Sequence, residues 1–398
     1  MNAEPTKGPG LLDRALAPWP LLAGAVLSFV GCCLLGRMVS QENIYQDFTR
    51  FHQFISPETL YYPTASQLRS VARSAADDDQ VLVIVGGSSI LYGTGQRPDH
   101  VWTRKLQDRL GPRYRVVNLA MHGCGPVAFG GVTAEALAAE HPRLIFVTGC
   151  WVNGGDCPPS IGTYGYIFWD ALYKGLLPDD EEHGTWAAQL KLDRAKDPTF
   201  PELKMQMKVD GVVWSRDLWT AVAYGHLSTV WSPLVNGTLR KARCSYPDPE
   251  DAPVSSDTRS FDVRYPPSLD AEALTIVRFW TAAGEAAAQG NPCLLVRSLQ
   301  AALPPSSRAR TLVLINEESP YYLDRLTPEE RKRYHSVFSR ASEVLAEQGG
   351  FHALTVGRGW KAEDYVDRCH LSESGGAKLA EQVAPQVEAL AHQLGYVP

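Results

Sequence analysis

The sequence predicts an α/β protein, built as a three-layer α/β/α arrangement around a five-stranded, mainly parallel sheet. Short, continuous apolar runs are typical of strands that are buried on both faces, as in parallel sheets. These runs alternate with segments of helical spacing, and that rhythm favours βαβ units. A hydrophobic content of 44% and a charged content of 21% are those of a folded globular protein.

The expected strands cover residues 81–85, 114–118, 144–148, 311–316 and 351–356. Helical spacing predicts helices over 65–75, 103–110, 128–140, 327–348 and 374–394. The helix from Thr327 has the strongest start signal, because Thr is a preferred cap and Pro328 suits the first helical position. It is expected to end at Gly349-Gly350.

The alternation breaks between 158 and about 305, a stretch too long for a plain loop. Helical spacing recurs over 216–231 and 271–289. We expect a mostly helical insertion that covers the C-terminal edge of the sheet and shapes a substrate cleft. A separate domain is the alternative.

The N-terminus carries an apolar segment, with no charged residue from Ala17 to Gly36. About 20 such residues are enough to cross a bilayer. We interpret 1–16 as a cytoplasmic tail, 17–37 as an uncleaved transmembrane signal anchor, 38–75 as a juxtamembrane connector and 76–398 as an extracytoplasmic domain. A cleaved signal peptide and a buried helix of a soluble protein are the alternatives.

Charge and composition narrow the function classes. A net charge of -6 and a pI near 6.0, with no basic stripe, argue against a nucleic-acid binder. The sequence has no zinc-finger spacing and no Walker loop, so we expect neither a metal nor a cofactor. In an oxidising compartment Cys369 has two candidate disulfide partners, Cys150 and Cys157.

Polar residues follow the first expected strand, in the sequence Gly86-Gly87-Ser88-Ser89. A hydroxyl at a strand-to-helix turn lies near free backbone N–H groups, which stabilise a developing oxyanion. Glycine and serine are also common turn residues, so the stretch alone fits an ordinary tight turn equally well.

The loop after the last expected strand contains Asp367-Arg368-Cys369-His370. A carboxylate three residues before a histidine can hold the imidazole in one tautomer, which leaves the other nitrogen free to accept a serine proton. Both loops leave the same edge of a parallel sheet, so we expect a Ser-His-Asp set there. A nucleophilic Cys124 is a less well partnered alternative.

These segments resemble the motifs of the SGNH, or GDSL-like, hydrolase superfamily. Its first block, Gly-Asp-Ser-x-x-x-Gly, is similar to Gly87-Ser88-Ser89-Ile90-Leu91-Tyr92-Gly93, with Ser88 in place of the aspartate. This register makes Ser89 the nucleophile and leaves Ser88 as the alternative. The last block matches at Asp367 and His370, and the resemblance implies a flavodoxin-like sheet.

The same resemblance implies an oxyanion hole made by Ser89, Gly123 and an asparagine of a Gly-x-Asn-Asp block. Here Asn153 is the candidate, two residues later than the block places it. Trp151 is expected to form a cleft wall, and Tyr321 lies where it can touch substrate or serve only in packing.

The resemblance implies an extracytoplasmic, periplasmic or extracellular, serine esterase or O-acyltransferase. Its expected substrate is an acyl ester of a carbohydrate, acetyl in particular, with lipid esters as a second option. The expected partners are the membrane and an envelope acyl-transfer complex. The alternative is a catalytically inactive SGNH-like protein that binds glycan or helps to assemble an envelope polysaccharide complex.

Overall fold

The computed structural model describes residues 18–41, 54–56, 59–60, 65–97, 100–154, 166–178, 180–190, 215, 218 and 267–397. The chain divides into two compact units, one from 1–46 and 201–244 and the other from 47–200 and 245–398. Apart from Leu218, the helix expected over 216–231 lies outside the described residues.

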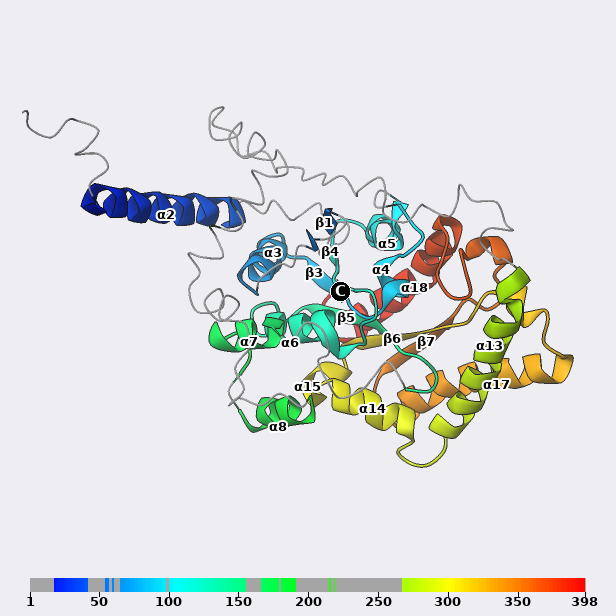
Figure 1. The fold of residues 1–398 in the computed structure, drawn as a ribbon. Helices are drawn as coiled ribbons and strands as arrows, with labels where there is room; N and C mark the ends of the chain where they lie inside the picture. The colour runs from blue at the N-terminus through cyan, green and yellow to red at the C-terminus, as the bar shows by residue number, and fades with distance from the viewer. Residues whose placement is uncertain are drawn as a thin grey trace, which may run out of the picture. The chain divides into compact units, whose positions relative to one another are not determined.

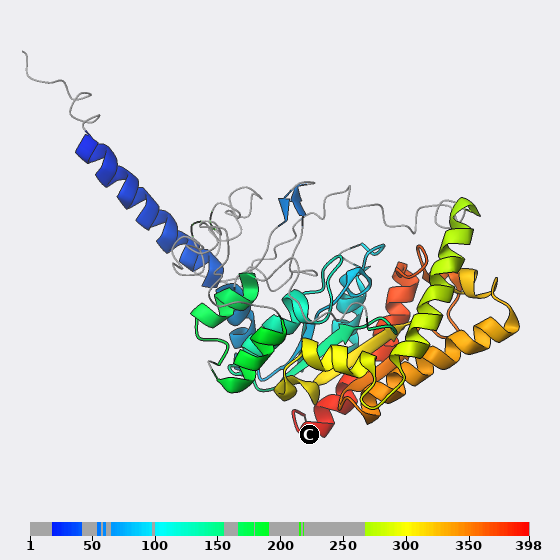
Figure 2. The same ribbon diagram turned by 60° about the horizontal axis from the view of Figure 1, so that its bottom comes forward.

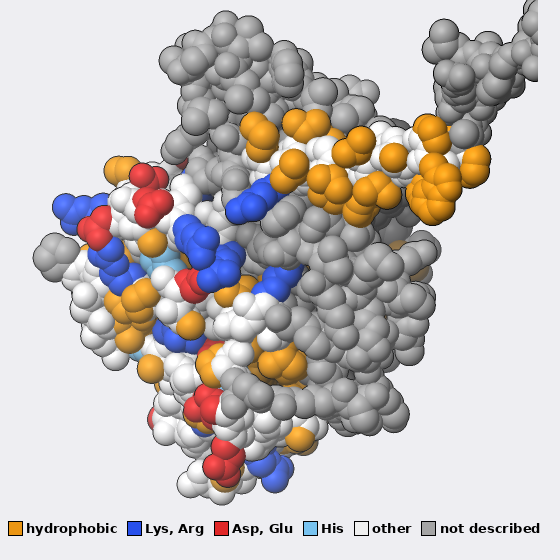
Figure 3. Space-filling model, turned by 90° about the vertical axis from the view of Figure 1, so that its left-hand side faces the viewer, with side chains coloured by type: hydrophobic (Ala, Val, Ile, Leu, Met, Phe, Trp, Pro, Cys, Tyr) orange, Lys and Arg blue, Asp and Glu red, His pale blue; other side chains and the backbone are white. Residues whose placement is uncertain are grey.

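The first unit contains α2 (Pro18–Gln41), whose residues Pro18–Met38 are long and apolar enough to cross a membrane. Its apolar side chains are exposed along the helix (Figure 3), with Trp19 at 78% and Leu27 at 72%. A row of exposed apolar side chains suits lipid better than water. The helix expected over 17–37 is therefore confirmed, and its role as an anchor and its orientation remain predictions.

The second unit is built on a sheet of five parallel strands: β3 (Val81–Val85), β4 (Tyr114–Asn118), β5 (Leu144–Gly149), β6 (Thr311–Asn316) and β7 (His352–Val356). The expected strands are confirmed to within one residue at each end. Their spatial order is β4-β3-β5-β6-β7. The chain passes from β3 to β4, which pairs with one edge of β3, and then to β5, which pairs with the other edge. The strand order therefore reverses at β3. Open α/β sheets bind ligands at such a reversal point.

Helices lie on both faces of this sheet (Figures 1 and 2). On one side, α5 (Trp102–Leu110) and α18 (Glu373–Gln393) pack against each other and against β4 and β5. Other helices that contact the strands are α3 (Ala65–Asp77), α6 (Val132–Ala138) and α17 (Pro328–Glu347). The expected α/β class is confirmed.

Local signals explain several helix ends. At the start of α17, the Thr327 side chain accepts from the Glu330 N–H at 3.2 Å, and the Glu330 carboxylate accepts from the Thr327 N–H at 2.9 Å. This reciprocal capping, with Pro328 at the first position, is the start that the sequence predicts.

The helix expected over 128–140 is instead a π-helical turn, η2 (Val127–Gly131), followed by α6. The turn packs backbone to backbone against the end of β3, because a Cβ added at Gly130 would lie 2.4 Å from the Gly86 Cα. Any side chain at either glycine would push the turn away from the strand that leads to Ser89.

The insertion is helical where the structure describes it, with α7 (Tyr166–Tyr173), α8 (Glu181–Gln189), α13 (Asp270–Ala287) and α14 (Leu294–Ala302). Of these, α7 contacts α3 and α6, while α13 and α14 pack on α17. These described helices therefore add to a helical layer. The expected cover over the C-terminal edge of the sheet stays a prediction, because much of the insertion lies outside the described residues. The connector contains an antiparallel pair, β1 (Phe54–Ser56) and β2 (Thr59–Leu60).

Candidate active site

The turn after β3 presents Ser89 at the C-terminal edge of the sheet. Gly87 has φ +121°, a conformation that other residues rarely adopt, and it lets the chain leave the strand sharply. Ser88 is the extended residue before the short helix α4 (Ser89–Tyr92), which ends at the left-handed Gly93. Ser89 is thus the first residue of that helix.

Two buried donors hold α4 in place through one carbonyl group. The Leu91 carbonyl oxygen accepts from the Trp102 Nε1–H at 2.7 Å and from the Asn118 Nδ2–H at 3.1 Å. Trp102 and Asn118 are fully buried on the neighbouring elements α5 and β4. The position of Ser89 is therefore determined by packed core groups.

Ser89, His370 and Asp367 form one continuous chain of hydrogen bonds. Ser89 Oγ lies 2.7 Å from His370 Nε2, and His370 Nδ1 lies 2.7 Å from Asp367 Oδ2. The second carboxylate oxygen, Oδ1, accepts from the backbone N–H groups of Cys369 and His370 at 2.9 and 2.8 Å. With Nδ1–H donating to the carboxylate, Nε2 is left to accept the serine proton.

The electrostatics of these hydrogen-bonded side chains favour a charged pair of Asp367 and His370. Burial opposes ionisation of Asp367, but hydrogen bonds from His370 hold the pKa of the carboxyl below its usual value. Burial also opposes the imidazolium, yet Cys369 and Asp367 outweigh it and raise the pKa of His370 to about 10. Cys369 Sγ lies 3.9 Å from His370 Nδ1. The neutral form of the His370 imidazole is therefore favoured by alkaline pH.

The loop 367–370, here called the acid–base loop because it carries Asp367 and His370, is held against the segment after β6. Arg368 pairs with the fully buried carboxylate of Glu318. Ser319 N–H donates to the Arg368 carbonyl at 2.8 Å, and Asn316 Nδ2 donates to the Cys369 carbonyl at 3.3 Å. Burial raises the pKa of Glu318 to about 7 against the opposing charge of Arg368.

Replacing Arg368 with methionine should lower the free energy of unfolding by about 3–5 kcal/mol, because it leaves Glu318 buried without a countercharge. The double variant Glu318→Gln with Arg368→Met removes both charges and should recover most of that loss. Denaturant unfolding of both variants measures the difference. Equal losses in the single and the double variant would show that the pair does not act as a unit.

A second link joins the acid–base loop to the segment after α4. Gln96 is buried; its amide donates to the Leu371 carbonyl at 3.3 Å, while its oxygen accepts from Trp102 N–H at 2.8 Å. Arg97 pairs with Glu373, in the first turn of α18, at 2.6 Å. These contacts join two segments that are more than 270 residues apart. Sequence reasoning did not single out Gln96, Arg97, Glu318 or Arg368.

The two other oxyanion candidates lie in turns on either side of the Ser89 turn. Gly123 follows β4 and has φ +66°, while Asn153 lies in the turn closed by the Gly154 N–H to the Trp151 carbonyl at 2.8 Å. Since β4 and β5 are the neighbours of β3 and run parallel to it, both turns follow strands that end at the same edge of the sheet as the Ser89 turn. In the same loop as Gly123, the ring of His122 packs on the ring of Tyr92, with ring centroids 4.5 Å apart.

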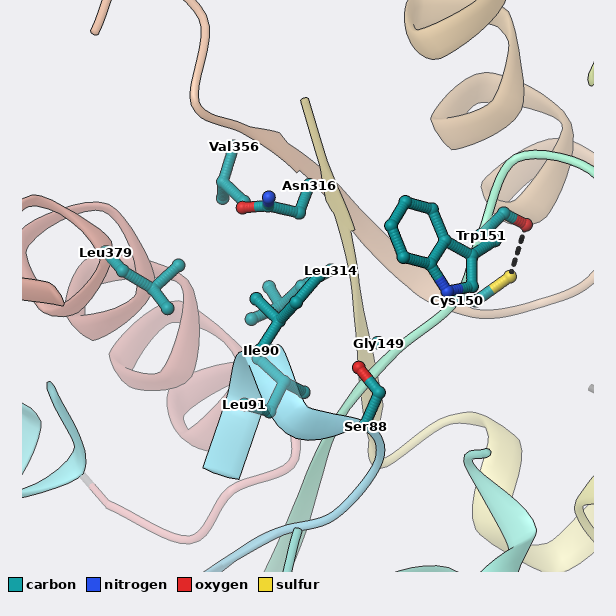
Figure 4. A pocket seen from close by; sticks show the side chains of 10 residues that line it. All are labelled: Ser88, Ile90, Leu91, Gly149, Cys150, Trp151, Leu314, Asn316, Val356 and Leu379. Carbon is teal, nitrogen blue, oxygen red and sulfur yellow. Dashed lines mark hydrogen bonds between the residues drawn. The ribbon is translucent and has the colours of Figure 1, made fainter. Parts of the chain in front are cut away.

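A cavity adjoins the Ser89 turn (Figure 4), lined by Ser88, Ile90, Leu91, Gly149, Cys150, Trp151, Leu314, Asn316, Val356 and Leu379. Trp151 forms one wall, as expected, and stacks on Trp280 of α13 with ring centroids 5.5 Å apart. Arg368 lies 5.6 Å from the same ring. Trp280 of the insertion thus supports the Trp151 wall of the cavity.

Tyr321 does not line this cavity. Its hydroxyl donates to Asp270 Oδ2 at 3.3 Å, and the Arg325 guanidinium lies 3.6 Å from its ring centroid. Through these two contacts Tyr321 packs α16 (Pro320–Leu323) against Asp270 and Arg325. They favour a role of Tyr321 in packing over a role in substrate binding.

The cysteines near the site are free thiols. The proposed pairing of Cys369 with Cys150 is wrong, because both are free, and Cys157 lies outside the described residues. Burial raises the pKa of Cys124 to about 11, which disfavours a thiolate nucleophile there.

Metal-binding side chains also meet at this site, since the ligand atoms of Asp367, Cys369 and His370 lie within 4.8 Å of one another. Two of these groups are already hydrogen-bonded to each other, and the imidazole also contacts Ser89.

No protein-family model matches this chain, and no curated protein is significantly similar to it.

Proposed function

We propose that this protein is a membrane-anchored serine esterase or O-acyltransferase of SGNH type, which acts outside the cytoplasm on acyl esters of a carbohydrate. The observation that carries the proposal is the hydrogen-bonded chain from Ser89 Oγ through His370 to Asp367, with 2.7 Å at each step. Nucleophile, base and orienting acid within hydrogen-bond reach are the general pattern of a covalent catalyst.

The fold supports the same proposal. Counted along the chain, the five strands have the order 2-1-3-4-5, which is the flavodoxin-like order. Ser89 follows the strand at which this order reverses, and the loop with His370 follows the last strand. The sheet order and the positions of Ser89 and His370 at the strand ends both support an SGNH-type enzyme.

The mechanism follows from the contacts. Ser89 Oγ attacks the ester carbonyl while His370 Nε2 takes its proton, and Asp367 keeps the other imidazole proton on Nδ1. Gly123, Asn153 and the Ser89 N–H are the proposed donors to the oxyanion. His370 then gives its proton to the leaving alcohol, and the acyl group remains on Ser89 until water or a sugar hydroxyl accepts it.

The second candidate is an inactive SGNH-like protein that binds glycan or assembles an envelope complex. Two departures favour it: Ser88 stands where the family block has aspartate, and Asn153 lies two residues late. A relay with short hydrogen bonds weighs against it, because a binding protein does not need one.

Fluorophosphonate labelling separates the two candidates. The detergent-solubilised full chain should become labelled at Ser89, as read by peptide mass spectrometry, and should hydrolyse phenyl acetate. An unlabelled protein that leaves the ester intact would favour the binding protein.

A further inference from the structure

The cavity beside Ser89 is placed to receive the acyl part of a substrate. Ser88 and Ile90, the residues on either side of Ser89, both line it. The opposite walls come from Leu314 at the end of β6, Val356 at the end of β7 and Leu379 of α18 (Figure 4). It therefore lies at the edge of the sheet where the nucleophile is presented.

The cavity is small and its walls are mostly apolar. Its volume is about 20 Å³, measured as the space open to the centre of a water-sized sphere. One water needs about 10–15 Å³ on this measure, so the cavity has room for one or two groups of that size. Longer chains would meet Leu314, Val356 and Leu379, which are fully or almost fully buried and have no free space to move into.

Among the described residues, Asn316 of this lining has one buried amide atom without a hydrogen-bond partner. Asn316 Nδ2 donates to the Glu317 carbonyl at 2.9 Å and to the Cys369 carbonyl at 3.3 Å, which determines the orientation of the amide. The other amide atom, Oδ1, is buried and has no hydrogen-bond partner in the part of the chain that the structure describes. A buried acceptor without a donor is costly, and it marks a place where a ligand donor is favoured.

We infer that this cavity is the acyl pocket, and that it selects a short acyl group bearing a hydrogen-bond donor on the carbon next to the carbonyl. A glycolyl group is the simplest example: its carbon fits the apolar walls and its hydroxyl donates to Asn316 Oδ1. The inference rests on the proposed function, and it replaces acetyl with a small hydroxyacyl group as the preferred substrate.

The test compares four phenyl esters with the detergent-solubilised full chain: acetate, glycolate, methoxyacetate and hexanoate. Each kcat/KM is divided by the rate of hydroxide-catalysed hydrolysis of the same ester, which removes differences in intrinsic reactivity. The corrected value for glycolate should exceed that for acetate by about tenfold, the size expected of one hydrogen bond. Methoxyacetate has no donor and should show no such gain, and hexanoate should fall at least about tenfold below acetate.

Two variants assign these effects to residues. In Asn316→Ala the ratio of glycolate to acetate should fall to about one, whatever happens to the absolute rates, because both esters share the same acid–base loop. Leu379→Ala should raise the ratio of hexanoate to acetate by about tenfold or more. Leu390→Ala is its matched control, since Leu390 is buried in the same helix and does not line the cavity. If Leu379→Ala fails to fold, Leu314→Val and its control Ile315→Val repeat the test on β6.

The outcomes are distinct. No hydrolysis of any ester would overturn the proposed function. Equal corrected rates for all four esters would leave the esterase standing and overturn the acyl pocket. A chain-length limit with glycolate no better than acetate would overturn the contact with Asn316.

Discussion

Replacing Ser89 with alanine should lower kcat for phenyl ester hydrolysis by about 10⁵-fold, which is the scale of losses for a nucleophile that acts with a base and an acid. The reason is the 2.7 Å contact between Ser89 Oγ and His370 Nε2, which gives the hydroxyl both its orientation and its base. In Ser89→Ala, steady-state kinetics should show the loss of ester hydrolysis, and the protein should no longer be labelled by the fluorophosphonate.

Ser88→Ala is the matched control, because it removes a hydroxyl from the adjacent residue. Ser88 precedes α4, and its side chain makes no capping hydrogen bond, so the loss should leave the turn folded. Ser88 lines the cavity, but no reacting proton passes through its hydroxyl, so we expect less than about a tenfold change in kcat. Activity that survived in Ser89→Ala and vanished in Ser88→Ala would overturn the register of the first motif.

The strands were predictable because each is a short apolar run. Successive residues of a strand point to opposite faces, so a run of consecutive apolar residues indicates a strand buried on both faces. The bounds of β3, β4 and β6 match the expected ones, and β5 and β7 differ by one residue at one end. The order β4-β3-β5-β6-β7 does not follow from any such run, since it depends on which strand edges pair across the chain.

The π-helical turn at 127–131 shows where local reasoning stops. Helical spacing over 128–140 is genuine, yet the backbone contact between Gly86 and Gly130 determines the local geometry. These two glycines lie on different elements, and nothing in the spacing of either segment indicates that they meet.

The same limit applies to the candidate site. Ser89, Asp367 and His370 could be proposed because each belongs to a short motif at a strand end. The residues that position them, Glu318 and Gln96, act through contacts with Arg368 and Leu371 that lie 50 and 275 residues away along the chain. A glutamate after a strand is an ordinary surface residue in the sequence; only its complete burial shows that it holds the acid–base loop.

Asp367→Asn should lower the maximal kcat/KM by about 10⁴-fold. The asparagine amide can donate to His370 Nδ1, which would place the imidazole proton on Nε2 and point it at Ser89. That tautomer cannot accept the serine proton. The backbone donors of Cys369 and His370 still find an oxygen on the new side chain, so the loop should keep its shape.

The pH profile should move in the same variant. Cys369 and Asp367 raise the pKa of His370 to about 10 against the effect of burial, so wild-type kcat/KM should increase with pH towards that value as the imidazole loses its proton. Without the Asp367 carboxylate the imidazolium loses a stabilising charge, its pKa falls, and the midpoint of the acid limb should shift to lower pH. Asp364→Asn is the control: Asp364 is buried in the same segment but pairs with Lys378, and should leave the midpoint unchanged. A midpoint that stayed in place in Asp367→Asn would mean that the titrating base is not His370.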